Sequence, residues 1–160
     1  DGINRVEATL RRFMQFVSPA RSGDPVDLAE LVGRAVEAFG HEARRQGVTV
    51  ETALEGVEVE ADAAALGEAV LHLVCEGIAG STMGSRLEVR VNRSGAEALL
   101  ALREFAAEPP ECAETEASVR RAEGTLPFAE RIVELHRGSL RLRKEATGRQ
   151  VEVRLPVAGR

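Results

Sequence analysis

Apolar residues recur at helical spacing in four segments of the chain. The first, residues 3–17, carries a narrow apolar seam of the kind found in coiled coils and helical bundles. Residues 27–46 and 63–79 carry wider apolar stripes, and Asp27 and Asp62 are their candidate N-caps. The fourth, residues 126–136, follows Thr125, which can cap a helix in the same way. The pattern therefore predicts four helices.

Apolar and polar residues alternate in the segments around these helices. Residues 48–53 and 57–60 indicate a short hairpin, and 86–92 and 97–105 a longer one with its turn at Arg93-Ser94-Gly95. Residues 139–157 indicate a closing hairpin that turns at Thr147-Gly148. The longer hairpins have one apolar and one charged face, so one face of the sheet is expected in water and the other under the helices. The predicted fold class is α+β, a two-layer α/β sandwich with a mixed, largely antiparallel sheet, preceded by one bundle helix.

Two segments show neither the helical spacing nor the strand alternation of apolar residues. Residues 18–25 are rich in Ser, Pro and Gly, which indicates a linker. Residues 106–123 are acidic and contain proline, and we expect a mobile loop of roughly 18 residues there. The chain begins at Asp1, without a methionine and already inside a helical pattern, so we expect it to be a fragment of a longer protein.

Composition excludes several classes of function. The net charge is −5 and no long basic run exists, so neither nucleic acid nor an anionic membrane is expected as a partner. The chain contains no run of about 18 apolar residues, which a membrane span requires, so no direct membrane contact is expected in this fragment. The two cysteines form no CxxC pair or Cys/His cluster. We therefore expect reduced thiols in a cytoplasmic protein.

The helix predicted at 63–79 carries an unusual polar stripe. Glu68, His72 and Glu76 are spaced four residues apart, so they share one edge of the helix. One interpretation is a metal or ligand site. The other is a solvated helix edge on which charge pairing raises the pKa of His72. We favour the second, because two helical turns supply too few ligands for a metal.

The order of elements resembles the C-terminal part of a sensor histidine kinase. Four stretches carry the resemblance: "PVDLAELVGRAVEAFGHEARRQGVTVE", "DAAALGEAVLHLVCEGI", "ERIVELHRGSLRLR" and "GRQVEVRLPV". It implies that residues 1–20 are the second helix of the dimerisation and phosphotransfer hairpin. It also implies that residues 26–157 are an ATP-binding domain of the GHKL class, also called Bergerat-like.

The nucleotide-binding motifs of that family are degenerate in this chain. The resemblance places His72 and Glu76 at the two asparagines of the N box, the second of which is a magnesium ligand in the family. Glu104 falls at the aspartate of the G1 box that reads adenine, and the following residues include none of that motif's glycines. The G2 box keeps Gly124, which precedes Thr125. These five residues are the vestigial nucleotide-binding positions.

The substitutions predict weak nucleotide binding or none. Glycines let the backbone approach phosphate, and a carboxylate at position 76 repels phosphate unless it holds a metal. We therefore expect no cofactor, no catalytic residue and a docking or regulatory pseudokinase. Its expected partners are a response regulator or another kinase, and a second copy bound through the N-terminal helix. Two alternatives stay open: a divergent active kinase whose Glu76 holds the magnesium of Mg-ATP, and a phosphotransferase that docks a response regulator.

Overall fold

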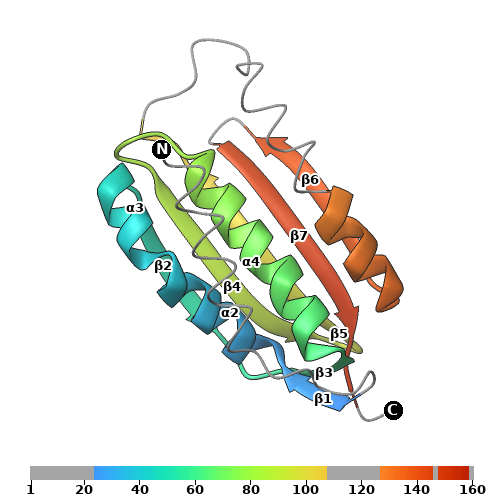
Figure 1. Ribbon diagram of the computed structural model, residues 1–160. Coiled ribbons are helices and arrows are strands. Elements are labelled where there is room, and N and C mark those ends of the chain that lie inside the picture. Colours follow the sequence, from blue (N-terminus) through green and yellow to red (C-terminus); the bar gives the residue numbers. More distant parts are fainter. Residues whose placement is uncertain (1–23, 108–126, 146–147, 159–160) are drawn as a thin grey trace.

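A five-stranded sheet forms one layer of the protein. The computed structural model describes residues 24–107, 127–145 and 148–158 (Figure 1). The sheet has the order β2-β4-β5-β7-β6. Among the described strands, only β2 and β4 pair in parallel, which confirms the mixed, largely antiparallel sheet. The strands are β2 (Thr49–Leu54), β4 (Arg86–Ser94), β5 (Glu97–Phe105), β6 (Ser139–Glu145) and β7 (Gly148–Pro156).

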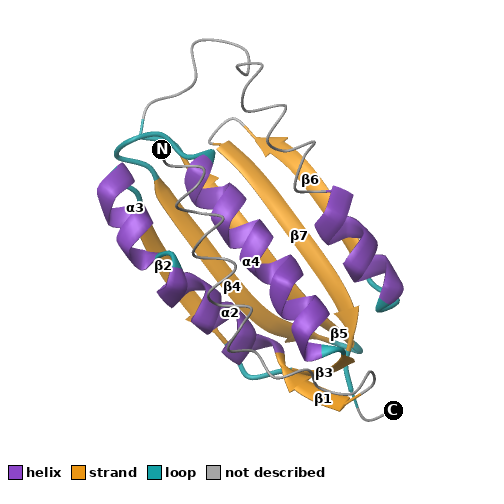
Figure 2. Ribbon diagram, in the orientation of Figure 1, coloured by secondary structure: helices purple, strands orange, loops and turns teal. Residues whose placement is uncertain are grey.

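Helices cover one face of this sheet. They are α2 (Leu28–Ala38), α3 (Gly40–Gln46), α4 (Ala63–Ala79) and a helix over residues 127–135. Figure 2 shows them in a single layer on the same side, which confirms the predicted α+β sandwich. The core lies between the layers, where apolar residues such as Val70 and Val74 of α4 and Val89 and Leu100 of the sheet are at most 1% exposed. Each such side chain stabilises the fold by about 1.5–3 kcal/mol.

Aspartates begin α2 and α4, as the sequence predicts. The Asp62 carboxylate accepts hydrogen bonds from the amides of Ala64 and Ala65, at 3.0 and 3.3 Å. Asp27 accepts one from the Ala29 amide at 3.0 Å. These bonds satisfy amides that have no partner within their own helix, so both boundaries are set locally.

The single helix predicted at 27–46 is wrong, because the chain breaks it at Phe39. This residue has φ −104° and ψ 9°, ends α2 and precedes α3. Its side chain is 1% exposed. Gly47 ends α3 in the left-handed region, at φ 74°. Phe39 lies four residues after Ala35 and four before Ala43, which are also buried, so the bend leaves it on the core-facing side of the chain.

The hairpin predicted from residues 48–53 and 57–60 is also wrong. Strand β2 pairs in parallel with β4, and α4 belongs to the connection between them, as parallel pairing requires. Strand β3 (Glu58–Ala61) pairs instead with β1 (Asp24–Asp27), a strand where the sequence predicted the end of a linker. Val57 and Val59 are buried in this arrangement. The chain therefore buries these valines and pairs β3 with the distant β1 instead of with the neighbouring β2.

The turn between β4 and β5 lies further along the chain than predicted. Arg93 and Ser94 still pair with Ala98 and Glu97, so the turn consists of Gly95 and Ala96. Gly95 has φ 62°, a conformation that glycine adopts at little cost. Several predicted features lie outside the described residues. They are the helix at 3–17, residues 18–23 of the linker, residues 108–123 of the loop, Gly124 and Thr125. No helix among the described residues is long and apolar enough to cross a membrane.

A side-chain amide from α3 holds the C-terminal end of α4. Gln46 Nε2 donates to the carbonyls of Ile78 and Ser81, at 2.7 and 2.8 Å, and lies 3.3 Å from that of Ala79. Gln46→Ala is expected to lower the free energy of unfolding by about 1–2 kcal/mol, because it removes two hydrogen bonds to partly buried carbonyls. Urea denaturation measures the change. Arg45→Ala, which removes only an exposed ion pair with Glu42, is the control and should cost less than about 0.5 kcal/mol.

Candidate functional site

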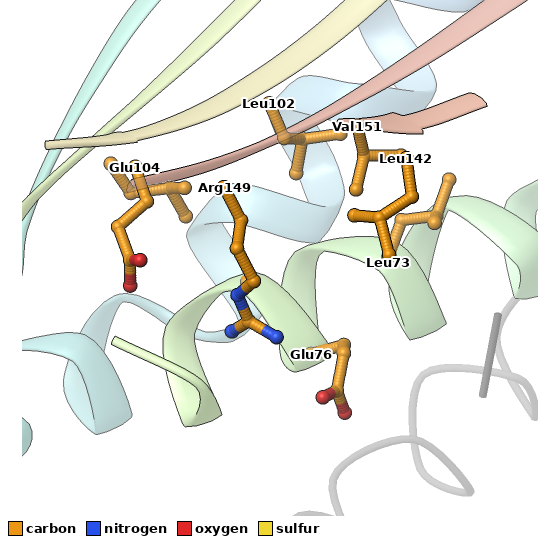
Figure 3. Close-up of a pocket in the computed structure, with 9 residues that line it drawn as sticks. Leu73, Glu76, Leu102, Glu104, Leu142, Arg149 and Val151 are labelled. Atoms are coloured by element: carbon orange, nitrogen blue, oxygen red, sulfur yellow. The ribbon is translucent and has the colours of Figure 1, made fainter. Parts of the chain in front are cut away.

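The last turns of α4 and four sheet strands, β4, β5, β6 and β7, enclose a small cavity. Its volume is about 30 Å³, room for about one water molecule. Apolar side chains make most of the wall, with two carboxylates and one guanidinium among them (Figure 3). The lining residues are Leu73, Glu76 and Gly77 of α4, with Leu87, Leu102, Glu104, Leu142, Arg149 and Val151 of the sheet.

The structure brings two of the predicted site residues, Glu76 and Glu104, into this one cavity. Glu104 follows Ala98, Leu100 and Leu102 in the alternation of β5, so it lies on the helix-covered face of the sheet. Glu76 is only 8% exposed. The prediction that Glu76 lies on a solvated helix edge is therefore wrong, because the last turns of α4 lie over the sheet.

Arg149 is a cavity residue that the sequence analysis missed. It lies on β7 two residues before Val151, and Figure 3 shows its side chain reaching toward α4 between Glu104 and Glu76. The signal was the same alternation, because Val151, Val153 and Leu155 place Arg149 on the apolar side of the hairpin. A charged residue at an apolar position near a strand end marks a site or a solvent-accessible edge.

His72 lies beside the cavity rather than in it. Its ring is tilted by 56° against the Phe128 ring, with the centroids 4.9 Å apart. Burial lowers the pKa of His72 below its ordinary value, and Glu68 only partly offsets the effect. The prediction of a raised pKa is therefore wrong, because loss of hydration outweighs the neighbouring carboxylate.

The lowered pKa of His72 makes stability depend on pH in one direction. The unfolded chain takes up a proton near pH 6.5, while the folded chain resists it until a lower pH. Stability is therefore undiminished above pH 6.5 and falls as the pH drops from that value toward the lower pKa of the folded chain. We expect wild type to lose more stability than His72→Gln between pH 7.5 and 5.5, as measured by urea denaturation. Equal losses in the two proteins would contradict the direction of the shift.

Two other residues with chemical potential have structural roles. Burial, with help from Glu76 and Glu42, raises the pKa of the Cys75 thiol to about 12, so it is a poor nucleophile at neutral pH. Nε2 of His136 accepts a hydrogen bond from the Asp62 amide at 3.2 Å, and Nδ1 lies 2.7 Å from the Ile132 carbonyl. A carbonyl can only accept, so Nδ1 carries the hydrogen. His136 thus joins the helix at 127–135 to the start of α4.

The polar stripe is not gathered into one cluster among the described residues. Among residues 24–107, 127–145 and 148–158, no three His, Cys, Asp or Glu side chains are grouped so as to hold a metal ion. Glu68 and His72 are partly exposed while Glu76 is buried, so the stripe is divided between two environments.

Comparison with solved structures defines the fold class: the chain has the fold of a histidine kinase catalytic domain. It is similar to the mycobacterial sensor histidine kinase MprB, with 21% identity, a TM-score of 0.67 and coverage of 84% of this chain and 98% of that one. The nucleotide-free catalytic domain of histidine kinase ThkA has 16% identity, a TM-score of 0.69 and coverage of 85% and 96%. Acinetobacter baumannii histidine kinase AdeS has 14% identity, a TM-score of 0.69 and coverage of 97% and 77%. No protein-family profile and no curated sequence matches the chain.

Proposed function

We propose that this chain is a two-component signalling module, a histidine-kinase-like domain that no longer binds Mg-ATP usefully and acts through docking. The observation that carries the proposal is the cavity between α4 and the sheet. Its volume of about 30 Å³ is far below the roughly 300–1,000 Å³ of sites that bury a small-molecule ligand. Arg149 extends through the space between the two carboxylates.

Charge also opposes a nucleotide at this site. Glu76 and Glu104 both line the cavity, and a triphosphate is itself strongly negative. Two like charges about 4 Å apart repel by about 4 kcal/mol at an effective dielectric constant of about 20, which corresponds to roughly a thousandfold in affinity. Residues 104–108 contain no glycine, so the backbone there cannot approach phosphate as a glycine-rich loop does.

One observation supports the alternative of a divergent kinase. Glu76 is a buried residue that lines the cavity, and a carboxylate is a ligand that magnesium prefers. Magnesium requires near-octahedral coordination, so water and phosphate oxygens would have to supply the ligands other than Glu76. The small volume of the cavity and its second carboxylate, Glu104, favour the proposed loss of Mg-ATP binding over this alternative.

Docking is the role that we infer for a domain of this fold that does not bind nucleotide. We propose a response regulator or a partner kinase as the protein bound, and a homodimer formed through the helix predicted at residues 3–17. That helix carries an apolar seam which needs a partner, and helices with such seams associate in water.

Wild type is expected to show no Mg-ATP binding with a Kd below about 1 mM. Isothermal titration calorimetry measures it, with magnesium alone as one arm and Mg-ATP as the other. The physical reason is the small cavity and its two carboxylates. A saturable heat with a Kd well below 1 mM, or an increase in melting temperature of several degrees with Mg-ATP, would establish the divergent-kinase alternative instead.

A further inference from the structure

We propose that the outer edge of β6 is a docking surface for an extended acidic segment of a partner protein, which adds to the sheet as a further strand. The inference rests on the proposed docking role and names the surface and the chemistry of the partner. Strand β6 lies at one end of the order β2-β4-β5-β7-β6, and among the described strands it pairs only with β7 (Figure 1).

The backbone of β6 has hydrogen-bonding groups that no described strand uses. In an antiparallel pair, the amide and carbonyl of successive residues point alternately toward the partner strand and away from it. Strand β6 has seven residues, so three or four of them present both groups at the outer edge. Such a row of groups is a template on which an extended peptide can form main-chain hydrogen bonds.

Two guanidinium groups on this strand are available to carboxylates. Arg141 and Arg143 are exposed and lie on the open face of the sheet, since Leu142 between them belongs to the helix-covered face. Neither forms an ion pair with a described residue. Glu152, the carboxylate opposite Arg141 on β7, pairs instead with Nε of Arg154 at 2.7 Å. Carboxylates on an added strand would therefore meet two unpaired cations.

Positive charge is concentrated at this edge although the chain as a whole is acidic. Residues 137–144 include four cations and no carboxylate before the strand ends at Glu145, whereas the net charge of the chain is −5. The opposite edge strand, β2, has a single charged residue, Glu51, and its carboxylate lies 3.7 Å from Nε of Arg86. An acidic partner is repelled by the net charge and attracted by β6, so electrostatics direct it to this edge.

A second copy of β6 is a poor occupant of the edge. Two β6 strands side by side would place Arg141 and Arg143 beside their counterparts, and like charges across a strand pair are destabilising. Basic side chains on an edge oppose such self-pairing. The same arginines favour a strand with carboxylates at alternate positions. The residues between those carboxylates would contact Leu142, whose side chain is 40% exposed at the edge, so apolar residues fit there.

The test uses the full chain and a fluorescein-labelled peptide of alternating glutamate and valine, about as long as β6. We expect fluorescence anisotropy to show saturable binding by wild type with a Kd below about 1 mM, weakening as salt is added. Arg141→Glu/Arg143→Glu should lower the affinity about tenfold or more. Arg34→Glu/Arg44→Glu makes the same change of charge at exposed positions of α2 and α3, and should lower it less than about threefold.

A peptide of alternating lysine and valine tests the same contact with the charges exchanged. We expect Arg141→Glu/Arg143→Glu to bind it more tightly than Arg34→Glu/Arg44→Glu does, although the two variants have equal net charge. If the glutamate variants do not fold, the corresponding glutamine variants remove the charges without reversing them and are compared in the same way on the acidic peptide. Equal affinities in the matched variants would show that net charge alone attracts the peptides, and would overturn the proposal.

Three further outcomes would also overturn it. The first is no saturable binding of the acidic peptide by wild type. The second is equal binding of the same peptide with all its backbone amides methylated, or of a single-stranded DNA oligonucleotide of equal charge, because neither forms the main-chain hydrogen bonds of an added strand. The third is self-association of wild type that the peptide reverses, which would assign the edge to a second copy.

A Mg-ATP arm separates this inference from the proposed function. Binding of Mg-ATP by wild type contradicts the proposed loss of nucleotide binding, while the peptide measurements still decide the role of β6. Absence of both Mg-ATP and peptide binding refutes the docking edge and leaves the loss of nucleotide binding standing. We expect Mg-ATP to leave the affinity for the acidic peptide unchanged, because Arg141 and Arg143 lie on the face of the sheet away from the cavity.

Discussion

Phe39→Ala is expected to lower the free energy of unfolding by about 3–5 kcal/mol. The ring is 1% exposed and is among the largest fully buried side chains of the described residues. Alanine removes its transfer free energy and leaves a cavity at the junction of α2 and α3 that the two short helices can only partly close. Guanidinium chloride denaturation monitored by circular dichroism measures the change.

Phe128→Ala is the matched control for Phe39→Ala. The same ring is removed, but Phe128 is 40% exposed and lies against the His72 ring at the surface. We expect Phe128→Ala to lower the free energy of unfolding by less than half as much as Phe39→Ala, since much of the Phe128 ring is already in water. Similar losses at the two positions would mean that burial of the ring does not explain the effect.

Gly138→Ala is expected to destabilise the protein by about 2–3 kcal/mol or more. A Cβ at this position would overlap the carbonyl oxygen of Arg154 and approach Cδ2 of Leu155 to 2.7 Å. The carbonyl belongs to the backbone of β7, so it cannot rotate away as a side chain can. The added methyl must therefore separate the turn from the sheet, an overpacking cost that thermal or urea denaturation measures.

The contrast with another glycine shows that the cost comes from space rather than residue type. Gly67 lies in the middle of α4, and a Cβ there would meet only Leu31 Cδ2, at 3.8 Å. Gly67→Ala should stabilise the protein by about 0.5–1 kcal/mol, because alanine loses less conformational freedom in a helix. A destabilising Gly67→Ala together with a neutral Gly138→Ala would contradict the described packing.

Elements whose signals are local could be predicted from the sequence. Helix α4 begins at the predicted cap, and β4 and β5 lie where the alternation placed them. Pairing between distant segments could not be predicted, because alternation says which face a residue occupies but not which strand lies beside it. Strands β2 and β3 illustrate this limit, since each pairs with a segment outside the predicted hairpin.

The sequence predicted residues of the candidate site only at positions that the motifs of the similar family include. It identified Glu76 and Glu104, which the structure places in one cavity, and His72, which lies beside it. Arg149 has no equivalent in the motifs compared and could be found only by applying the strand alternation to the charged residues. The lowered pKa of His72 depends on how the helix at 127–135 packs against α4, which no local pattern contains.

The position of β7 has a consequence for synthesis of the protein on the ribosome. This strand is the last of the described elements, yet it lies between β5 and β6, and β6 has no other neighbour in the sheet. Until residues 148–156 have left the ribosome, β6 has no strand to pair with, and the edge of β5 is open to other chains. Premature termination even a few residues before this strand would therefore remove a whole side of the sheet, whereas the β2–β4–β5 portion would already have its pairing partners.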